Sequence, residues 1–135
     1  MSDNEQLERK AMEAEYLRVQ TSEIQKQIAQ LQAASQELRA TKAALDNLEF
    51  LKKGTLFPLG AGVFVKSVVP ATDSLLVDVG ARTLAQQSPQ NVQKLLEERL
   101  SNLEKSMMEL TDAYSAGQER MQALASEFQR LNRMR

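Results

Sequence analysis

The sequence has no cysteine and no histidine. Without cysteine the chain has no disulfide framework, no thiolate nucleophile and no zinc site built on sulfur. Without histidine it also lacks the commonest metal ligand and the usual general base near neutral pH. We therefore expect no catalytic residue, no metal site, no cofactor and no enzymatic activity.

Aromatic residues are also scarce: they make up 4% of the 135 residues, and tryptophan is missing. Glycine and proline number only 5 and 3, while Ala, Gln, Glu, Leu, Lys and Arg dominate. This balance is typical of long, surface-exposed helices. We therefore expect a mainly α fold of the α+β class in a single domain, residues 1–135.

No charge of either sign is in excess, because 17 basic residues oppose 18 acidic ones for a formal charge of −1. Nucleic-acid binding needs a clustered surplus of Lys and Arg, which is missing here. No stretch approaches the ~18–20 apolar residues that span a bilayer, and the first residues do not resemble a signal peptide. We expect a soluble, cytoplasmic protein that binds neither nucleic acid nor membrane.

The first part of the chain has apolar residues at intervals of seven, which predicts a coiled-coil helix over residues 3–53. Its strong seam is formed by Leu17, Ile24, Leu31, Leu38 and Leu45. A companion seam is smaller and partly polar, and consists of Leu7, Ala14, Thr21, Ile28, Ser35 and Lys42. Ser2 with Glu5 fits a capping box at the start, and Gly54 follows two lysines at the end.

The last part predicts a second helix over 89–134, opened by Ser88 as N-cap and Pro89 at the first helical position. Its seam alternates in steps of four and three and is filled by larger side chains: Leu96, Leu100, Leu103, Met107, Leu110, Tyr114, Gly117, Met121, Leu124, Phe128 and Leu131. Large residues here can fill the space left by small ones in the first helix, which favours an antiparallel pair. The register we predict pairs Leu45 with Leu96, Leu38 with Leu103, Leu31 with Leu110, Ile24 with Gly117 and Leu17 with Leu124.

Between the helices the seven-residue period disappears, and valine and glycine become frequent. We predict strands near 55–59, 63–69, 75–79 and 82–86, in two short hairpins that form an assembly segment, residues 55–86. A β segment this short cannot bury its own faces, so it should pair with other chains. The predicted assembly residues are Leu56, Phe57, Leu59, Val63, Phe64, Val65, Val68, Val69, Leu75, Leu76, Val77 and Val79.

A long helix, the run from Leu56 to Lys66 (LFPLGAGVFVK), the run from Leu75 to Ala81 (LLVDVGA) and a second long helix together resemble the prefoldin alpha subunit, of archaeal type. The resemblance covers the whole chain in architecture, and residues 56–81 carry its distinctive motif. Beyond Ala81 the chain continues as Arg82-Thr83-Leu84-Ala85-Gln86-Gln87, which is less apolar than the family pattern and predicts a weak fourth strand.

The resemblance implies a hexamer of two alpha-type and four beta-type subunits, with the hairpins forming a β platform and the helical pairs ending in free tips. It implies an ATP-independent holdase that binds non-native client proteins at the tips and delivers them to a group II chaperonin. The alternative is a coiled-coil adaptor or structural oligomerisation protein without chaperone activity. Two hairpins between the helices favour the chaperone, because a passive rod has no need of them.

The helical tips hold the candidate client-binding residues: Leu7, Met12, Tyr16, Leu17, Leu124, Phe128, Leu131 and Met134. Leu17, Leu124, Phe128 and Leu131 lie on the seams, where packing within the helical pair is the simpler interpretation. Met12, Tyr16 and Met134 lie off the strong seams, so contact with a client fits them better. Methionine suits that role because its side chain is flexible and polarizable.

Overall fold

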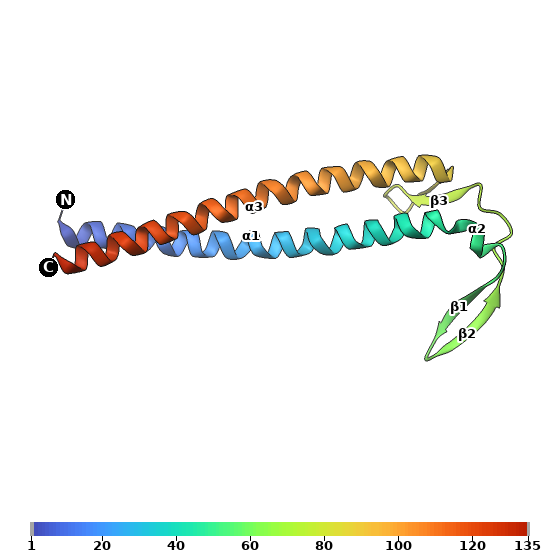
Figure 1. Cartoon of the computed structure of the whole chain (residues 1–135), viewed down its shortest axis with the longest axis horizontal. Coiled ribbons are helices and arrows are strands. Elements are labelled where there is room, and N and C mark those ends of the chain that lie inside the picture. Colours follow the sequence, from blue (N-terminus) through green and yellow to red (C-terminus); the bar gives the residue numbers. More distant parts are fainter. Residues whose placement is uncertain (1, 135) are drawn as a thin grey trace. The chain divides into compact units, whose positions relative to one another are not determined.

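A computed structural model describes residues 2–134 of the chain (Figure 1). Its elements are α1 (Asp3–Asp46), α2 (Leu48–Leu51), β1 (Thr55–Gly60), β2 (Val63–Ser67), β3 (Leu75–Asp78), β4 (Leu84–Gln87) and α3 (Pro89–Arg133). Two long helices and two small antiparallel hairpins confirm the predicted fold class. The chain divides into a helical unit, Met1–Ala34 with Leu103–Arg135, and a hairpin unit, Ser35–Asn102.

Both predicted N-caps are present. The backbone N–H of Glu5 donates to the Ser2 hydroxyl at 3.3 Å, and that of Asn91 donates to the Ser88 hydroxyl at 3.1 Å. Each bond satisfies a donor that the first turn of a helix leaves without an internal partner. The sequence therefore fixes where α1 and α3 begin.

The end of the first helix differs from the prediction, because the helix expected over 3–53 is divided at Asn47. The Asn47 backbone N–H bonds to the carbonyl of Ala44, and its side-chain amide donates to the carbonyl of Ala43 at 2.9 Å. Asparagine favours such local bonds over regular helix. After this break α2 forms a single turn, and Gly54 at φ +116° leads into β1.

In the helical unit, the N-terminal part of α1 and the C-terminal part of α3 run antiparallel (Figure 1), and Lys10 of α1 contacts Glu127 of α3. Leu124 is fully buried, and Thr21 is buried with its hydroxyl donating to the carbonyls of Leu17 and Arg18. A Cβ placed on Gly117 would lie 2.6 Å from the Thr21 methyl group.

This contact contradicts the predicted pairing of Gly117 with Ile24, because Gly117 lies against Thr21, three residues earlier on α1. We had aligned the strong seam of the first helix with that of the second. The helices instead set a small residue of the companion seam against the one position on α3 that has no side chain.

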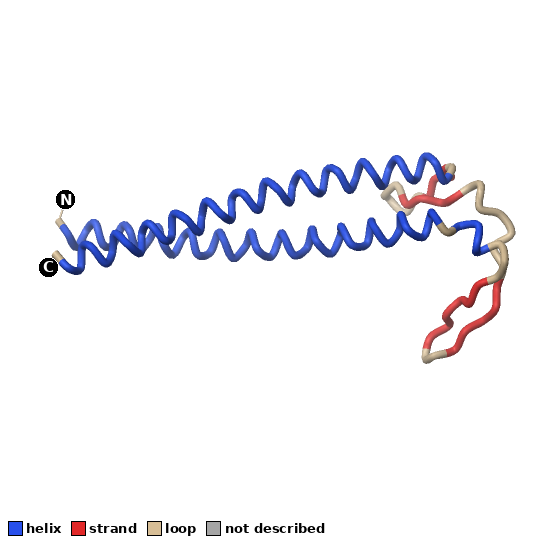
Figure 2. The backbone as a smooth tube through the Cα atoms, in the orientation of Figure 1, coloured by secondary structure: helices blue, strands red, loops and turns tan. Residues whose placement is uncertain are grey.

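The two hairpins form separate two-stranded sheets, drawn in red in Figure 2. In the first, Thr55 pairs with Ser67 and Pro58 with Phe64, and Leu59 bulges out before Gly60 pairs with Val63. In the second, β3 pairs with β4 from Leu75–Gln87 to Asp78–Leu84. The weak fourth strand is therefore present and pairs along the whole of β3.

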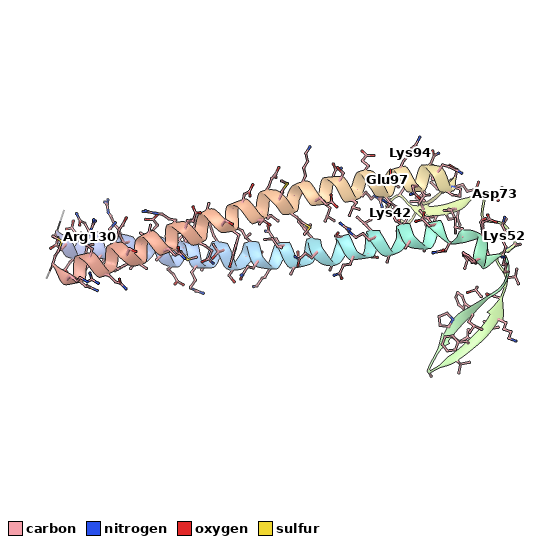
Figure 3. All side chains as sticks on the ribbon, in the orientation of Figure 1. Lys42, Lys52, Asp73, Lys94, Glu97 and Arg130 are labelled. Carbon is pink, nitrogen blue, oxygen red and sulfur yellow. The ribbon has the colours of Figure 1, made fainter. Side chains whose placement is uncertain are left out.

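The hairpin unit has a small interior of its own. Val92 and Leu96 are buried in the first turns of α3, and the buried Thr72 donates to a carboxylate oxygen of Glu49 at 3.3 Å. Lys42 of α1 and Glu97 of α3, labelled in Figure 3, form an ion pair at 3.8 Å. No helix in residues 2–134 is long and apolar enough to cross a bilayer.

Candidate assembly and client-binding surfaces

The β1–β2 hairpin exposes large apolar side chains on both faces. Because paired residues share a face, Phe57 and Val65 lie on one face, and Pro58 and Phe64 lie on the other. Every residue of β1 and β2 except Thr55 and Ser67 is exposed. An isolated two-stranded ribbon with apolar residues on both faces is marginal in water. Both faces of this hairpin are therefore open to contact with another chain.

The β3–β4 hairpin is covered on one face only. Leu75 and Val77 of β3 are half-buried with Ala85 and Gln87 opposite them, whereas Leu76 and Leu84 face solvent. Of the predicted assembly residues, nine are exposed: Leu56, Phe57, Leu59, Val63, Phe64, Val65, Val68, Leu76 and Val79. Val69, Leu75 and Val77 are half-buried within the chain.

Two exposed apolar residues of the hairpin unit escaped the sequence analysis, namely Phe50 and Leu84. Leu84 was not among the predicted assembly residues, because its strand was predicted to be weak. In β4 exposed and half-buried residues alternate, and Leu84 is on the exposed side while Ala85 is half-buried. Phe50 was assigned to a long helix that in fact ends before it. A hollow of about 720 Å³ at the root of the hairpin lies between Lys53, Leu56, Lys66 and Val68.

The predicted tip residues fall into two groups. Leu124 is fully buried, and Leu7, Leu17, Phe128 and Leu131 are half-buried along the helical seam. Met12, Tyr16 and Met134 are exposed. The exposed group contains the three residues that lie off the strong seams, so these side chains are free to touch another protein.

Val19 is a third exposed large apolar residue of α1, after Met12 and Tyr16. The spacing of four and then three residues places all three on one side of the helix. We call Met12, Tyr16 and Val19 the outer stripe. The same spacing is present in the sequence, but Val19 lies off the strong seam and was not predicted.

Beside the outer stripe, ion pairs join α1 to α3. The Arg120 guanidinium donates to both carboxylate oxygens of Glu13, at 2.7 and 3.0 Å, and also lies 3.8 Å from Glu127. Lys10 pairs with Glu127. These charges join the two helices within the helical unit.

These pairs shift the acidity of their carboxyl groups. The hydrogen bond from Arg120 lowers the pKa of Glu13 below its ordinary value, and the hydrogen bond from Lys10 does the same to the pKa of Glu127. Both groups are solvent-accessible, so water and salt weaken the interactions. A shallow groove of about 340 Å³ lies among Gln6, Arg9, Lys10, Arg130 and Leu131.

Nothing in residues 2–134 resembles a metal site, since the described acidic side chains form no group of three that could hold an ion. The exposed apolar side chains described above gather on two surfaces, a two-sided hairpin and a stripe on a helix.

Residues 17–133 match the family model described as Prefoldin subunit. Among curated proteins, the prefoldin subunit alpha of Pyrococcus horikoshii is 26% identical over 130 residues, which cover 94% of this chain and 88% of that protein. Prefoldin subunit alpha 1 of Methanocaldococcus jannaschii is 30% identical over 121 residues, with 90% and 79% covered.

A solved structure supports the same fold. The cryo-EM structure of filamentous PFD from Methanocaldococcus jannaschii superimposes with a TM-score of 0.71 at 24% identity, covering 87% of this chain and 98% of that one. This chain therefore shares its fold with that protein.

Proposed function

The chain belongs to the prefoldin family, in its archaeal alpha type, and from that membership we propose that it is a subunit of an ATP-independent holdase chaperone. In this proposal it assembles with beta-type subunits, in a hexamer of two alpha and four beta chains, in the cytoplasm. The complex holds non-native proteins at the helical tips and delivers them to a group II chaperonin.

The hairpin unit supports the assembly part of this proposal. Its β1–β2 ribbon has exposed apolar side chains on both faces, and neither face is covered within the described chain. The predicted assembly residues provide this surface, with Leu84 added. Burial of such side chains against neighbouring hairpins contributes roughly 1.5–3 kcal/mol for each one fully covered.

The outer stripe supports the client-binding part. Met12 is 73% exposed in a helix that already packs its seam against α3. A flexible thioether beside an aromatic ring and a valine can adapt to apolar segments of different sequence. Met134, which directly follows α3, adds a second exposed methionine in the helical unit. Leu124 is buried, so it packs within the helical pair and does not contact a client. Phe128 and Leu131 are half-buried, so a client can contact only the exposed part of each side chain.

The test replaces the outer stripe by serine, Met12→Ser, Tyr16→Ser and Val19→Ser together, in the assembled complex. Suppression of the aggregation of an unfolded model protein, measured by light scattering without nucleotide, should fall several-fold, because the apolar contact is lost. Native mass of the complex should not change.

The matched control is Met108→Ser, since Met108 is a methionine on α3 of similar exposure, 69%, that lies outside the stripe. It should leave aggregation suppression intact. Full suppression by the stripe variant would refute the tip assignment. A wild-type complex that assembles but never suppresses aggregation would instead identify a structural coiled-coil protein.

A further inference from the structure

The shallow groove of the helical unit is lined mainly by cations. Its lining consists of Gln6, Arg9, Lys10 and Glu13 of α1 with Arg130 and Leu131 of α3. The four residues of α1 follow one another at steps of three, one and three positions, so they share one side of the helix. Three of the six side chains are positively charged and one is negatively charged. The groove therefore favours a negatively charged ligand.

Two of these charged side chains already have partners within the helical unit. Glu13 accepts hydrogen bonds from Arg120 on both of its carboxylate oxygens. Lys10 forms an ion pair with Glu127. These four charges balance one another, so the net positive charge of the groove comes from its two arginines.

Arg9 and Arg130 are both exposed, and within residues 2–134 neither guanidinium forms an ion pair or a hydrogen bond. Arg130, labelled in Figure 3, attracts Glu127 through its charge, but that carboxylate is already bonded to Lys10. A guanidinium presents its N–H donors in a planar fork that matches the two oxygens of a carboxylate. Both arginines are therefore available to bind carboxylates of another molecule.

Apolar side chains adjoin these arginines. Half-buried Leu131 lines the groove itself. Arg9 precedes Met12 by three positions and Tyr16 by seven, so it lies next to the outer stripe on the surface of α1. Met12 and Tyr16 are 73% and 62% exposed. A ligand that binds Arg9 and extends along the stripe must therefore carry apolar groups beside its negative charge.

The charges of the groove favour a peptide over a nucleic acid. A nucleic acid carries a negative charge at every nucleotide and needs a run of cations. The groove offers two unpaired cations, and Glu13 in its lining repels further phosphates. A peptide carries a carboxylate only where Asp or Glu occurs, so it can place one at the arginines and apolar side chains on the stripe.

We propose that the groove binds the carboxylate of an Asp or Glu residue in a non-native client segment whose neighbouring apolar side chains cover the outer stripe. The inference rests on the client-binding role proposed above. It adds charge selectivity to that role, because acidic apolar segments bind more tightly than neutral segments of equal apolar content.

Fluorescence anisotropy with labelled unfolded peptides tests this selectivity on the assembled complex. The probe is a short peptide of leucine, serine and glutamate, and matched peptides carry glutamine or lysine in place of glutamate. The wild-type complex should bind the glutamate peptide about fivefold more tightly than the glutamine peptide, as expected from two exposed ion pairs. About 1 M salt should remove most of this preference, because it screens the charges.

Variants of the two arginines locate the effect. Arg9→Gln with Arg130→Gln should remove the preference and leave binding of the glutamine peptide unchanged. Arg9→Glu with Arg130→Glu should reverse it in favour of the lysine peptide. The matched control, Arg99→Gln with Lys105→Gln, also removes two positive charges from exposed positions, but outside the groove. This control should keep the preference.

Equal binding of the glutamate and glutamine peptides by the wild type would overturn the proposal. Loss of the preference in the control, or tighter binding of a single-stranded oligonucleotide than of the glutamate peptide, would also overturn it. Light scattering on the same samples separates the groove from the proposed function. A complex that suppresses aggregation without preferring glutamate retains the function and refutes the groove. A complex that prefers glutamate without suppressing aggregation retains the charge selectivity and refutes the holdase role.

Discussion

Gly117 lies where α3 approaches α1 so closely that one added carbon would overlap a neighbour. The overlapped atom is the Thr21 methyl group, and Thr21 cannot easily turn aside because its hydroxyl bonds to the carbonyls of Leu17 and Arg18, at 2.9 and 3.1 Å. Glycine costs a helix about 1 kcal/mol relative to alanine. The close approach therefore explains why a poor helix former occupies a seam position.

Gly117→Ala should consequently destabilise the helical unit, although alanine is the better helix former. Overpacking of a tight contact costs about 1–3 kcal/mol, which exceeds the propensity gain over most of that range. The midpoint of thermal unfolding, followed by circular dichroism at 222 nm, should fall by several degrees.

Adding Thr21→Ala should reverse the loss, because alanine at position 21 removes the overlapped methyl group. The double variant should be more stable than Gly117→Ala alone, and Thr21→Ala alone completes the double-mutant cycle. If the two substitutions were simply additive, the contact would not be the cause.

The same residue shows how far the sequence could predict the packing. The seven-residue period correctly identified Leu124 as a seam residue, and it is fully buried. Period alone cannot tell which of two seams on α1 meets α3, since that depends on how closely the backbones approach. The glycine contained this information, but only the contact with Thr21 reveals it.

At the scale of the element, the predicted helix starts were accurate, because a serine side chain caps the first backbone amides. The predicted end of the first helix was wrong, because an asparagine side chain bonds to a backbone carbonyl and interrupts the helix. Ser2 and Ser88 bond to the amides of Glu5 and Asn91, as predicted. Asn47 instead bonds backward to Ala43 and ends α1 early. The local pattern did not show that Asn47 would do this, because Leu48, Phe50 and Leu51 follow it and favour a continued helix.

The ion pairs between α1 and α3 should make the helical unit sensitive to acid. The pKa values of Glu13 and Glu127 are lowered in the folded chain, by hydrogen bonds from Arg120 and Lys10. Their contribution to stability is complete above the unfolded pKa of about 4.3 and is lost as pH falls through the lower folded values. The melting temperature should therefore drop as the pH falls below about 4.

The variant Glu13→Gln with Glu127→Gln should show a smaller drop between pH 6 and pH 3 than the wild type. Glu15→Gln is the matched control, because the pKa of Glu15 is also lowered, by Arg18 of the same helix. That control changes no contact between helices. Identical acid profiles for the wild type and the double variant would show that these pairs do not stabilise the helical unit.

At the scale of the whole molecule, the surfaces that we propose for assembly and for clients belong to different units of the chain, so the two roles should be separable by mutation. Phe57→Ser with Phe64→Ser removes one exposed aromatic ring from each face of the β1–β2 hairpin. Native mass spectrometry should show loss of the oligomer, while helical circular dichroism is retained.

The serine substitutions at Met12 and Tyr16 serve as the control, because they also remove exposed apolar side chains, but from the helical unit. They should leave the oligomer intact. Loss of assembly in both variants, or in neither, would contradict the separation. The apolar pattern of the sequence supplied the residues of both proposed surfaces, whereas the pairing of Pro58 with Phe64 emerged only from the structure.

The pairing of distant segments in the helical unit also has a consequence for synthesis on the ribosome. Lys10 and Glu127 are 117 positions apart, while β1 pairs with its immediate successor β2. A growing chain can close its hairpins as soon as they emerge, but the start of α1 must wait for the end of α3. During that interval its leucine seam is exposed, so the nascent subunit itself needs protection from aggregation.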